Sequence, residues 1–224
     1  MDDIARVPRP KDRARASYNR MSALYDVLTL GERRFQRTGL GLLAVQAGER
    51  VLEIGAGTGW ACAQLAAAVG AEGGVLGVDI ADRMLERAGR RLRRAGLAGR
   101  VELIRCDATA LPCADAAFDA IYMSFTLELF DTPEIPTVLA ECRRVLRPGG
   151  RIAVVALARE ATFATHAYEA LHRLLPATLD CRPIHPAAAL DAAGLPVVTV
   201  RRQREWGLGV EMVLARSPED GPLA

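Results

Sequence analysis

Short apolar runs alternate with amphipathic segments along most of the chain, and this alternation predicts the fold. Apolar runs typical of buried strands cover residues 51–54, 75–79, 101–105, 118–124 and 151–157. Segments with apolar residues at helical spacing lie between them, at 60–69, 82–95 and 132–146. Strands that alternate with helices over this length predict an α/β fold with a doubly wound, seven-stranded, mostly parallel sheet.

The last two apolar runs and the two ends of the chain complete this picture. The runs at 197–201 and 210–215 lie too close for a helical crossover, so we expect a hairpin in which the last strand of the chain is antiparallel to the rest of the sheet. Residues 12–216 form one predicted domain, with a helical lid at 12–47 and a helical acceptor-site region at 158–194. Residues 1–11 and 217–224 are expected to be flexible tails.

Composition narrows the class of protein. The 224 residues are half hydrophobic and a quarter charged, with a net charge of +2, which suits one globular domain and gives no reason to expect nucleic acid. No apolar run reaches the roughly 18 residues of a membrane span, and the first residues lack a secretion signal. Five cysteines without C-x-x-C spacing are interpreted as reduced thiols of a cytoplasmic protein, with no metal site.

An arginine-rich helix is predicted at 82–95, and it has two interpretations. Its arginines fall mostly away from the apolar stripe, and no aromatic residue is interleaved with them. A solvated helix face is therefore favoured over a nucleic-acid patch.

The first strand is followed by the motif Val51-Leu-Glu-Ile-Gly-Ala-Gly-Thr-Gly59. Glycine tolerates positive φ and lacks a Cβ, so a ligand can lie directly against the backbone. Asp79 ends the next strand, 20 residues after Gly59, where a carboxylate can accept hydrogen bonds from a ribose. Trp60 stands where a dinucleotide fingerprint would have its third glycine. Asp107 and Ala108 follow the third strand and could meet an adenine amino group.

These motifs resemble a known family. The pattern Glu53-x-Gly-x-Gly-x-Gly followed by Asp79 resembles motif I of class I S-adenosylmethionine-dependent methyltransferases. Four further stretches are similar to the ubiquinone/menaquinone-biosynthesis C-methyltransferase group (methyltransferase type 11-like): Asp79-Ile80 with Met84-Leu85, Cys106-Asp107-Ala108 with Leu111-Pro112, Phe118-Asp119 through Ser124-Phe125, and Arg144 to Gly150. The resemblance covers Tyr18 to Leu157.

The resemblance implies S-adenosyl-L-methionine as cofactor, with S-adenosyl-L-homocysteine as product. Thr58, Asp79, Asp107, Ala108 and Ser124 match cofactor-contact positions of the family. Together with the glycine motif and the predicted lid, the resemblance gives this set of cofactor-binding candidates: Tyr18, Tyr25, Glu53, Gly55, Ala56, Gly57, Thr58, Asp79, Ile80, Met84, Asp107, Ala108, Ser124 and Phe125.

The role of the aromatic residues near the N-terminus is left open by the pattern. Tyr18, Met21, Tyr25 and Leu28 share one helical face. They could anchor the helix on the core, or they could form a lid with tyrosine hydroxyls near the cofactor. The pair Tyr25-Asp26 sits where many small-molecule methyltransferases of this kind carry a Tyr-Asp pair.

The acceptor is also left open. The resemblance favours a small molecule, either quinol-like or another secondary metabolite, whereas 180–184 looks like related phospholipid or metabolite N- or O-methyltransferases. Two different classes remain as alternatives: a non-catalytic S-adenosylmethionine-binding protein and an NAD-dependent oxidoreductase. We expect a small-molecule methyl acceptor as the partner, no nucleic acid and no stable membrane insertion, with a homodimer as an open alternative.

Methyl transfer needs a general base only if the acceptor must lose a proton. His166, Tyr25 and Glu128 are the candidates for catalytic groups, and His172 and His185 fall in the same acceptor-site region as His166. Asp131, like Glu128, follows the fourth strand and is a further candidate. Arg182 is a candidate for holding an anionic group of the substrate.

Overall fold

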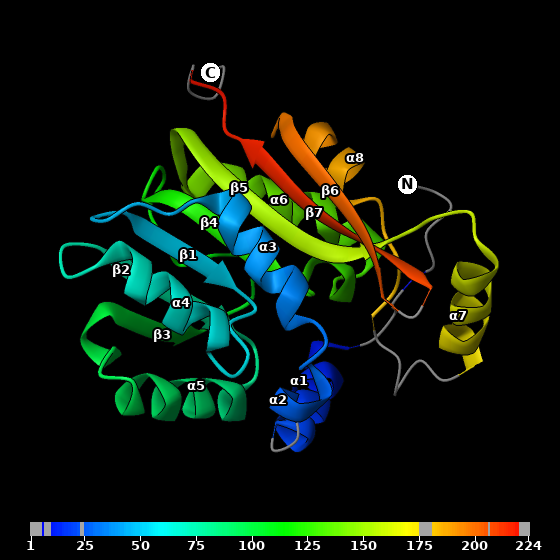
Figure 1. Cartoon of the computed structure of the whole chain (residues 1–224), viewed down its shortest axis with the longest axis horizontal. Helices are drawn as coiled ribbons and strands as arrows, with labels where there is room; N and C mark the ends of the chain where they lie inside the picture. The colour runs from blue at the N-terminus through cyan, green and yellow to red at the C-terminus, as the bar shows by residue number, and fades with distance from the viewer. Residues whose placement is uncertain (1–5, 7–9, 23–24, 175–180, 206, 220–224) are drawn as a thin grey trace.

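A single twisted sheet forms the centre of the computed structural model, which describes residues 6, 10–22, 25–174, 181–205 and 207–219 (Figure 1). The sheet has seven strands in the order β3-β2-β1-β4-β5-β7-β6. Their bounds are β1 Arg50–Ile54, β2 Gly74–Asp79, β3 Val101–Arg105, β4 Phe118–Ser124, β5 Leu146–Ala158, β6 Val197–Glu205 and β7 Leu208–Arg216. Strands β1 to β5 are parallel, and β7 runs antiparallel to both β5 and β6. The predicted doubly wound sheet with an antiparallel last strand is confirmed.

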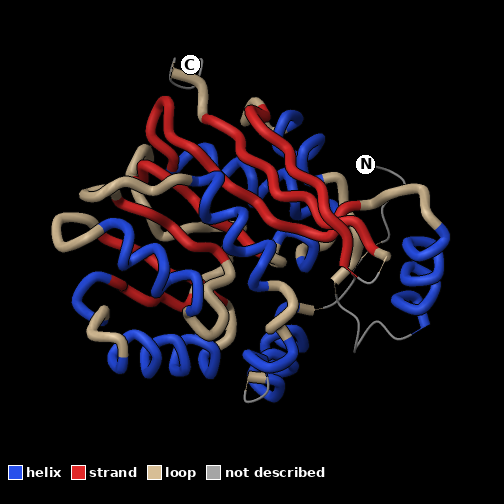
Figure 2. The backbone as a smooth tube through the Cα atoms, viewed as in Figure 1, coloured by secondary structure: helices blue, strands red, loops and turns tan. Residues whose placement is uncertain are grey.

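Helices cover both faces of this sheet. Their bounds are α1 Lys11–Met21, α2 Tyr25–Leu28, α3 Arg33–Leu43, α4 Trp60–Val69, α5 Asp82–Arg94, α6 Ile135–Val145, α7 Phe163–Leu174 and α8 Pro186–Ala192. Helices α3 and α4 pack on one face and share a core with residues of β1, β4 and β5. Helices α6 and α8 pack on the other face and form the second core. Figure 2 shows these layers, with α1 and α2 below the sheet rather than on either face.

The predicted lid at 12–47 divides into two parts with different surroundings. Phe35 and Leu43 of α3 are fully buried against the sheet, so this helix is part of the core, although its Arg33 and Gln36 line a cavity described below. Only α1 and α2 lie next to the cleft described below. The predicted acceptor-site region divides in the same way, because Leu190 of α8 is fully buried in the core. Residues 175–180 of that region lie outside the described residues.

Several boundaries differ from those predicted. The fifth strand begins at Leu146 rather than Arg151, because Leu146 pairs with Phe118 and a register shift absorbs the Pro-Gly-Gly segment that follows. The hydroxyl of Thr132, just before Pro133, is a sequence signal for the cap of the next helix. Instead the Asp131 side chain accepts from the Thr132 amide, and the Asp131 amide donates to Glu134.

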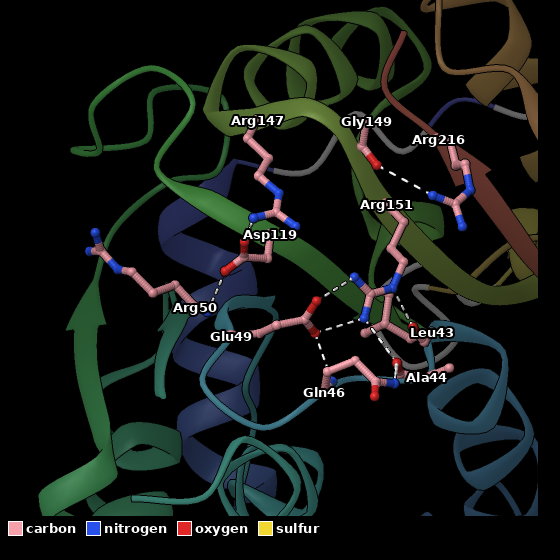
Figure 3. A network of polar contacts seen from close by, with 10 residues as sticks. All are labelled: Leu43, Ala44, Gln46, Glu49, Arg50, Asp119, Arg147, Gly149, Arg151 and Arg216. Atoms are coloured by element: carbon pink, nitrogen blue, oxygen red, sulfur yellow. Dashed lines mark hydrogen bonds and ion pairs between the residues drawn. The ribbon is translucent and has the colours of Figure 1, made fainter. Parts of the chain in front are cut away.

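A polar network ties the chain together where the strands begin (Figure 3). Arg151 donates to the Leu43 carbonyl at 2.5 Å and pairs with Glu49 at 2.7 Å, and both charged side chains are largely buried. Asp119 accepts from the Arg50 amide at 2.6 Å and pairs with Arg147. Asp119 therefore has the structural surroundings expected from its place at the start of a strand, far from the glycine turn.

The described part of the N-terminal segment contacts the domain. Arg6 pairs with Asp131 at 2.6 Å, and Lys11 is already the first residue of α1. The other residues of the expected tail, except Pro10, lie outside the described part of the chain. Within the described residues, no helix is both long enough and apolar enough to cross a membrane.

Candidate functional site

The three glycines after β1 have different surroundings, although all three have positive φ. A Cβ on Gly55 would lie 2.2 Å from the Thr126 hydroxyl oxygen, and one on Gly59 would lie 2.7 Å from the Ala88 Cβ. A Cβ on Gly57 would have only Tyr25 as its nearest side chain, at 3.7 Å. Gly55 and Gly59 therefore let other parts of the protein pack closely, and only Gly57 leaves its backbone open to a ligand.

A cleft of about 960 Å³, counting the part open to solvent, lies at the carboxyl ends of β1 to β4 and under α1. This is the edge of an open parallel sheet at which ligands bind in this class of fold. Ten of the predicted residues line it: Tyr18, Tyr25, Gly55, Gly57, Asp79, Ile80, Met84, Asp107, Ala108 and Phe125. The cleft also includes Asp131, a further candidate for a catalytic group, and residues that the sequence did not single out, among them Lys11, Thr126, Leu129, Phe130 and Glu134.

A smaller cavity shares Tyr25, Gly55 and Gly57 with the cleft. Its volume is about 430 Å³, again including open solvent, and its walls are more polar. The remaining predicted residues line it: Glu53, Ala56, Thr58 and Ser124. The structure therefore brings every predicted cofactor-binding residue to one of two connected spaces around the glycine turn.

Asp79 joins the end of β2 to the glycine turn. One of its carboxylate oxygens accepts from the Gly57 amide at 2.9 Å and the other from the Ala81 amide at 2.8 Å. Burial raises the pKa of Asp79, and the hydrogen bonds from backbone amides oppose that rise. The carboxylate thus holds the turn in place and offers only acceptor positions to a ligand.

Glu53 is a buried acid at the floor of the smaller cavity. It is 4% exposed, and one of its carboxylate oxygens has no hydrogen-bond partner among the described residues. Burial raises the pKa of Glu53 to about 8, the charge of Asp79 adds to this rise, and a hydrogen bond with Cys62 opposes it. A cationic group in the cavity would favour the ionised form of this carboxyl.

Lys11 is the only lysine of the chain, and it connects α1 to the opposite wall of the cleft. Its ammonium lies 2.5 Å from Asp107 and 2.8 Å from Glu134. Burial would raise the pKa of Asp107, but hydrogen bonds from Lys11 and Thr109 outweigh it and the pKa is lowered. The sequence predicted Asp107 as an acceptor for an adenine amino group but did not predict its contact with the Lys11 ammonium. The one signal that could have drawn attention to Lys11 is that it is a single lysine in a chain rich in arginine.

Asp26 connects the short helix α2 to the glycine turn. Its carboxylate accepts from the Thr58 hydroxyl at 2.7 Å and pairs with Arg91 of α5 at 2.8 Å. The neighbouring Tyr25 faces both cavities and meets the ring of Tyr18 edge to face at 6.4 Å. The tyrosines therefore lie at the cleft rather than in the hydrophobic core.

Two of the three catalytic candidates do not reach either cavity. His166 is exposed on α7 and lines neither space. Glu128 is fully buried, and its carboxylate accepts from the Leu157 amide at 3.1 Å, so it faces the protein interior. Burial raises the pKa of Glu128 to about 8. Of these three candidates, only Tyr25 lines the cavities, so the geometry favours Tyr25 over His166 and Glu128.

The other polar candidates of the acceptor-site region also lie elsewhere. His172 is buried within α7, and His185 precedes α8. Arg182 is 1% exposed and donates to the Glu128 carbonyl at 2.5 Å and to the Thr132 hydroxyl at 3.1 Å. Instead of holding a substrate anion, Arg182 fixes the segment that carries Leu129 and Phe130 to the cleft.

Comparisons with known proteins agree with this geometry. Residues 51–150, which run from β1 into β5 and contain the glycine turn, Asp79 and Asp107, match the model of a methyltransferase domain. This part of the chain is a methyltransferase domain. The ubiquinone/menaquinone biosynthesis C-methyltransferase of Klebsiella pneumoniae is 36% identical over 143 residues, covering 62% of this chain and 56% of that protein. The chain spans less than two thirds of the length of the curated quinone methyltransferases that it matches.

Comparison with solved structures shows that the chain has the class I methyltransferase fold. A putative sarcosine dimethylglycine methyltransferase from Galdieria sulphuraria superposes with a TM-score of 0.69 at 16% identity, covering 85% of this chain and 87% of that one. The [4+2]-cyclase SpnF superposes with a TM-score of 0.69 at 21% identity, covering 84% and 81%. Because a cyclase has this fold too, the fold alone does not assign methyl transfer.

Proposed function

We propose that this chain transfers the methyl group of S-adenosylmethionine to a small, quinol-like acceptor. The observation that carries the proposal is the convergence of Gly57, Asp79 and Asp107 on one cleft within a methyltransferase domain. The similarity to quinone-biosynthesis methyltransferases supports the choice of acceptor.

The residues present fit this cofactor in three ways. Asp79 offers acceptor oxygens for ribose hydroxyls beside the open backbone of Gly57. Ile80, Met84 and Phe125 give the same cleft apolar walls that suit a purine ring. The partnerless oxygen of Glu53 in the adjoining cavity suits the ammonium of an amino-acid moiety. The proposed roles follow from these donor, acceptor and apolar surfaces.

The protein's contribution to such a reaction is alignment and exclusion of water. S-adenosylmethionine supplies a methyl group that its sulfonium already activates. The chain has to hold the acceptor in line with that methyl group, which can lower the barrier substantially without a covalent intermediate. Helices α1 and α2 cover the cleft through the contacts of Lys11 and Asp26, and they would keep water away while charge is dispersed.

The side chains on the cleft wall support the proposed class of acceptor. Phe125, Leu129 and Phe130 come from the segment after β4 and present apolar surface. This surface favours an aromatic ring over a strongly charged acceptor. Tyr25 lines both cavities, so we assign its hydroxyl to orient the acceptor by a hydrogen bond.

The test is a screen with S-adenosylmethionine labelled at the methyl group. Hydroquinones and naphthoquinols, phenols, amines and phospholipids are supplied one at a time, and the products are identified by mass spectrometry. We expect labelled carbon on a quinol ring. Label on a nitrogen or oxygen atom of another class of compound would change the proposed acceptor but would support the proposed methyl transfer. Cofactor binding with no transfer to any acceptor would contradict the proposed reaction.

A further inference from the structure

A third hollow lies on the outer side of the glycine turn, separate from the cleft, and it shares Asp26 and Thr58 with the smaller cavity. It measures about 710 Å³, including the part open to solvent, and four arginines of α5 form most of its wall. Asp26 and Thr58 lie among the other lining residues. We call this feature the arginine hollow. Its arginines are Arg87, Arg90, Arg91 and Arg94, which fall on one stripe of the helix.

Few acceptors balance these guanidinium groups. Arg91 donates to Asp26 at 2.8 Å and to the Thr58 carbonyl at 2.7 Å, and Arg90 lies 3.9 Å from Glu86. Arg87 and Arg94 have no ion pair or hydrogen bond from their side chains within the described part of the chain. Asp26 is the only carboxylate in the lining, and it also lies 3.7 Å from Arg33.

This concentration of charge is specific to α5. The helix carries six arginines and two acidic residues, whereas the whole chain has a net charge of only +2. Like charges three or four residues apart destabilise a helix, and the stripe holds several such pairs. The helix dipole favours cations only in the last turn, so it does not account for Arg87. An anion in the hollow would relieve this repulsion.

We propose that the arginine hollow binds a phosphate-bearing anion. Guanidinium forks match the oxygens of phosphate in pairs, and convergent arginines are the usual protein surface for such a group. The lining contains no aromatic side chain on which a nucleobase could stack, so the surface fits the phosphate group itself rather than a single-stranded nucleic acid. The phosphate can belong to a free anion or to a lipid headgroup. The proposal does not depend on methyl transfer.

Anion binding in the arginine hollow would affect the contacts of the glycine turn. Arg91 belongs to the hollow and also holds Asp26 and Thr58 in place. Phosphate oxygens beside Arg91 would compete with the Asp26 carboxylate for the same guanidinium. The hollow is thereby connected to α2, which covers the cleft from the other side.

The experiment titrates the full chain with inorganic tripolyphosphate by calorimetry, without any cofactor. Variants Arg87→Gln and Arg94→Gln remove the arginines that have no protein partner. Arg93→Gln is the matched control, because Arg93 is exposed on the same helix but outside the hollow. We expect saturable, salt-sensitive binding that each test variant weakens by about tenfold and the control by less than about twofold. Thermal melting of each variant confirms that it is folded.

A second arm separates the two sources of phosphate. Phosphatidylcholine vesicles with and without phosphatidylglycerol are sedimented with the wild-type chain and the same three variants. Binding to tripolyphosphate alone assigns a free anion, and binding to the anionic vesicles alone assigns a headgroup. The proposal is overturned if neither probe binds, if Arg93→Gln weakens binding as much as the test variants, or if an RNA oligonucleotide binds at lower concentration than both probes.

Discussion

Glu53 illustrates how the environment of a single residue changes its chemistry. It belongs to β1, where its neighbours on both sides are other strands of the sheet. The side chain is buried beneath the glycine turn, and its pKa is raised to about 8 because burial disfavours the charged form. The sequence predicted that Glu53 belongs to the cofactor motif. It did not predict that the carboxyl would hold its proton at neutral pH.

This raised pKa has a consequence for stability. Between the unfolded pKa near 4.5 and the folded pKa near 8, the folded chain binds more protons, so stability falls as pH rises. The amide in Glu53→Gln does not ionise, so the stability of this variant lacks the pH dependence that the Glu53 carboxyl causes. We therefore expect the variant to gain stability relative to the wild type from pH 5 to pH 8, by at most about 1.4 kcal/mol per pH unit.

Chemical denaturation at several pH values measures this difference. Glu72→Gln, in an exposed turn, is the control and should parallel the wild type at every pH. A constant difference between Glu53→Gln and the wild type would show that Glu53 ionises normally in the folded state.

At the scale of elements, helix α1 is attached to the cleft through a few polar contacts. Lys11 joins it to Asp107 and Glu134, and the Asn19 side chain accepts from the Arg83 amide at 3.0 Å. Ser17 is its one buried residue, so apolar packing holds α1 less firmly than it holds α3, in which Phe35 and Leu43 are fully buried. Such an element is expected to open locally before the rest of the domain.

We predict that Lys11→Met loosens α1 without unfolding the domain. Methionine keeps most of the length of the side chain but removes both ion pairs. Because the Lys11 side chain is 45% exposed, each pair contributes at most about 1 kcal/mol. Amide hydrogen exchange within α1 should therefore become about fivefold faster, while exchange in α4 stays unchanged.

Arg15→Met is the matched control, because among the described residues Arg15 of the same helix pairs only with Asp12, at 3.5 Å, within α1. Unchanged exchange after Lys11→Met, or an equal increase after Arg15→Met, would show that the contacts with Asp107 and Glu134 do not hold the helix.

At the scale of the whole molecule, the pattern of apolar residues predicted the sheet and the edge at which the cleft lies. Local patterns suffice for this, because alternating strands and helices leave few topologies and place Gly57, Asp79 and Asp107 at the same edge. Other features depend on contacts between distant segments. The burial of Glu128 beside Arg182 and the attachment of α1 by Lys11 join residues at least 54 positions apart. No periodicity in the sequence reports such contacts.

Calorimetric titration with S-adenosylmethionine tests the central claim most directly, because it reports binding without requiring the acceptor. The proteins compared are the wild type, Asp79→Asn, and Glu72→Gln as a control in the exposed turn that precedes β2. We predict saturable binding to the wild type and to Glu72→Gln, and binding at least about tenfold weaker for Asp79→Asn, since a charged hydrogen bond is lost. Failure of the wild type to bind, or equal affinity for Asp79→Asn, would contradict the account.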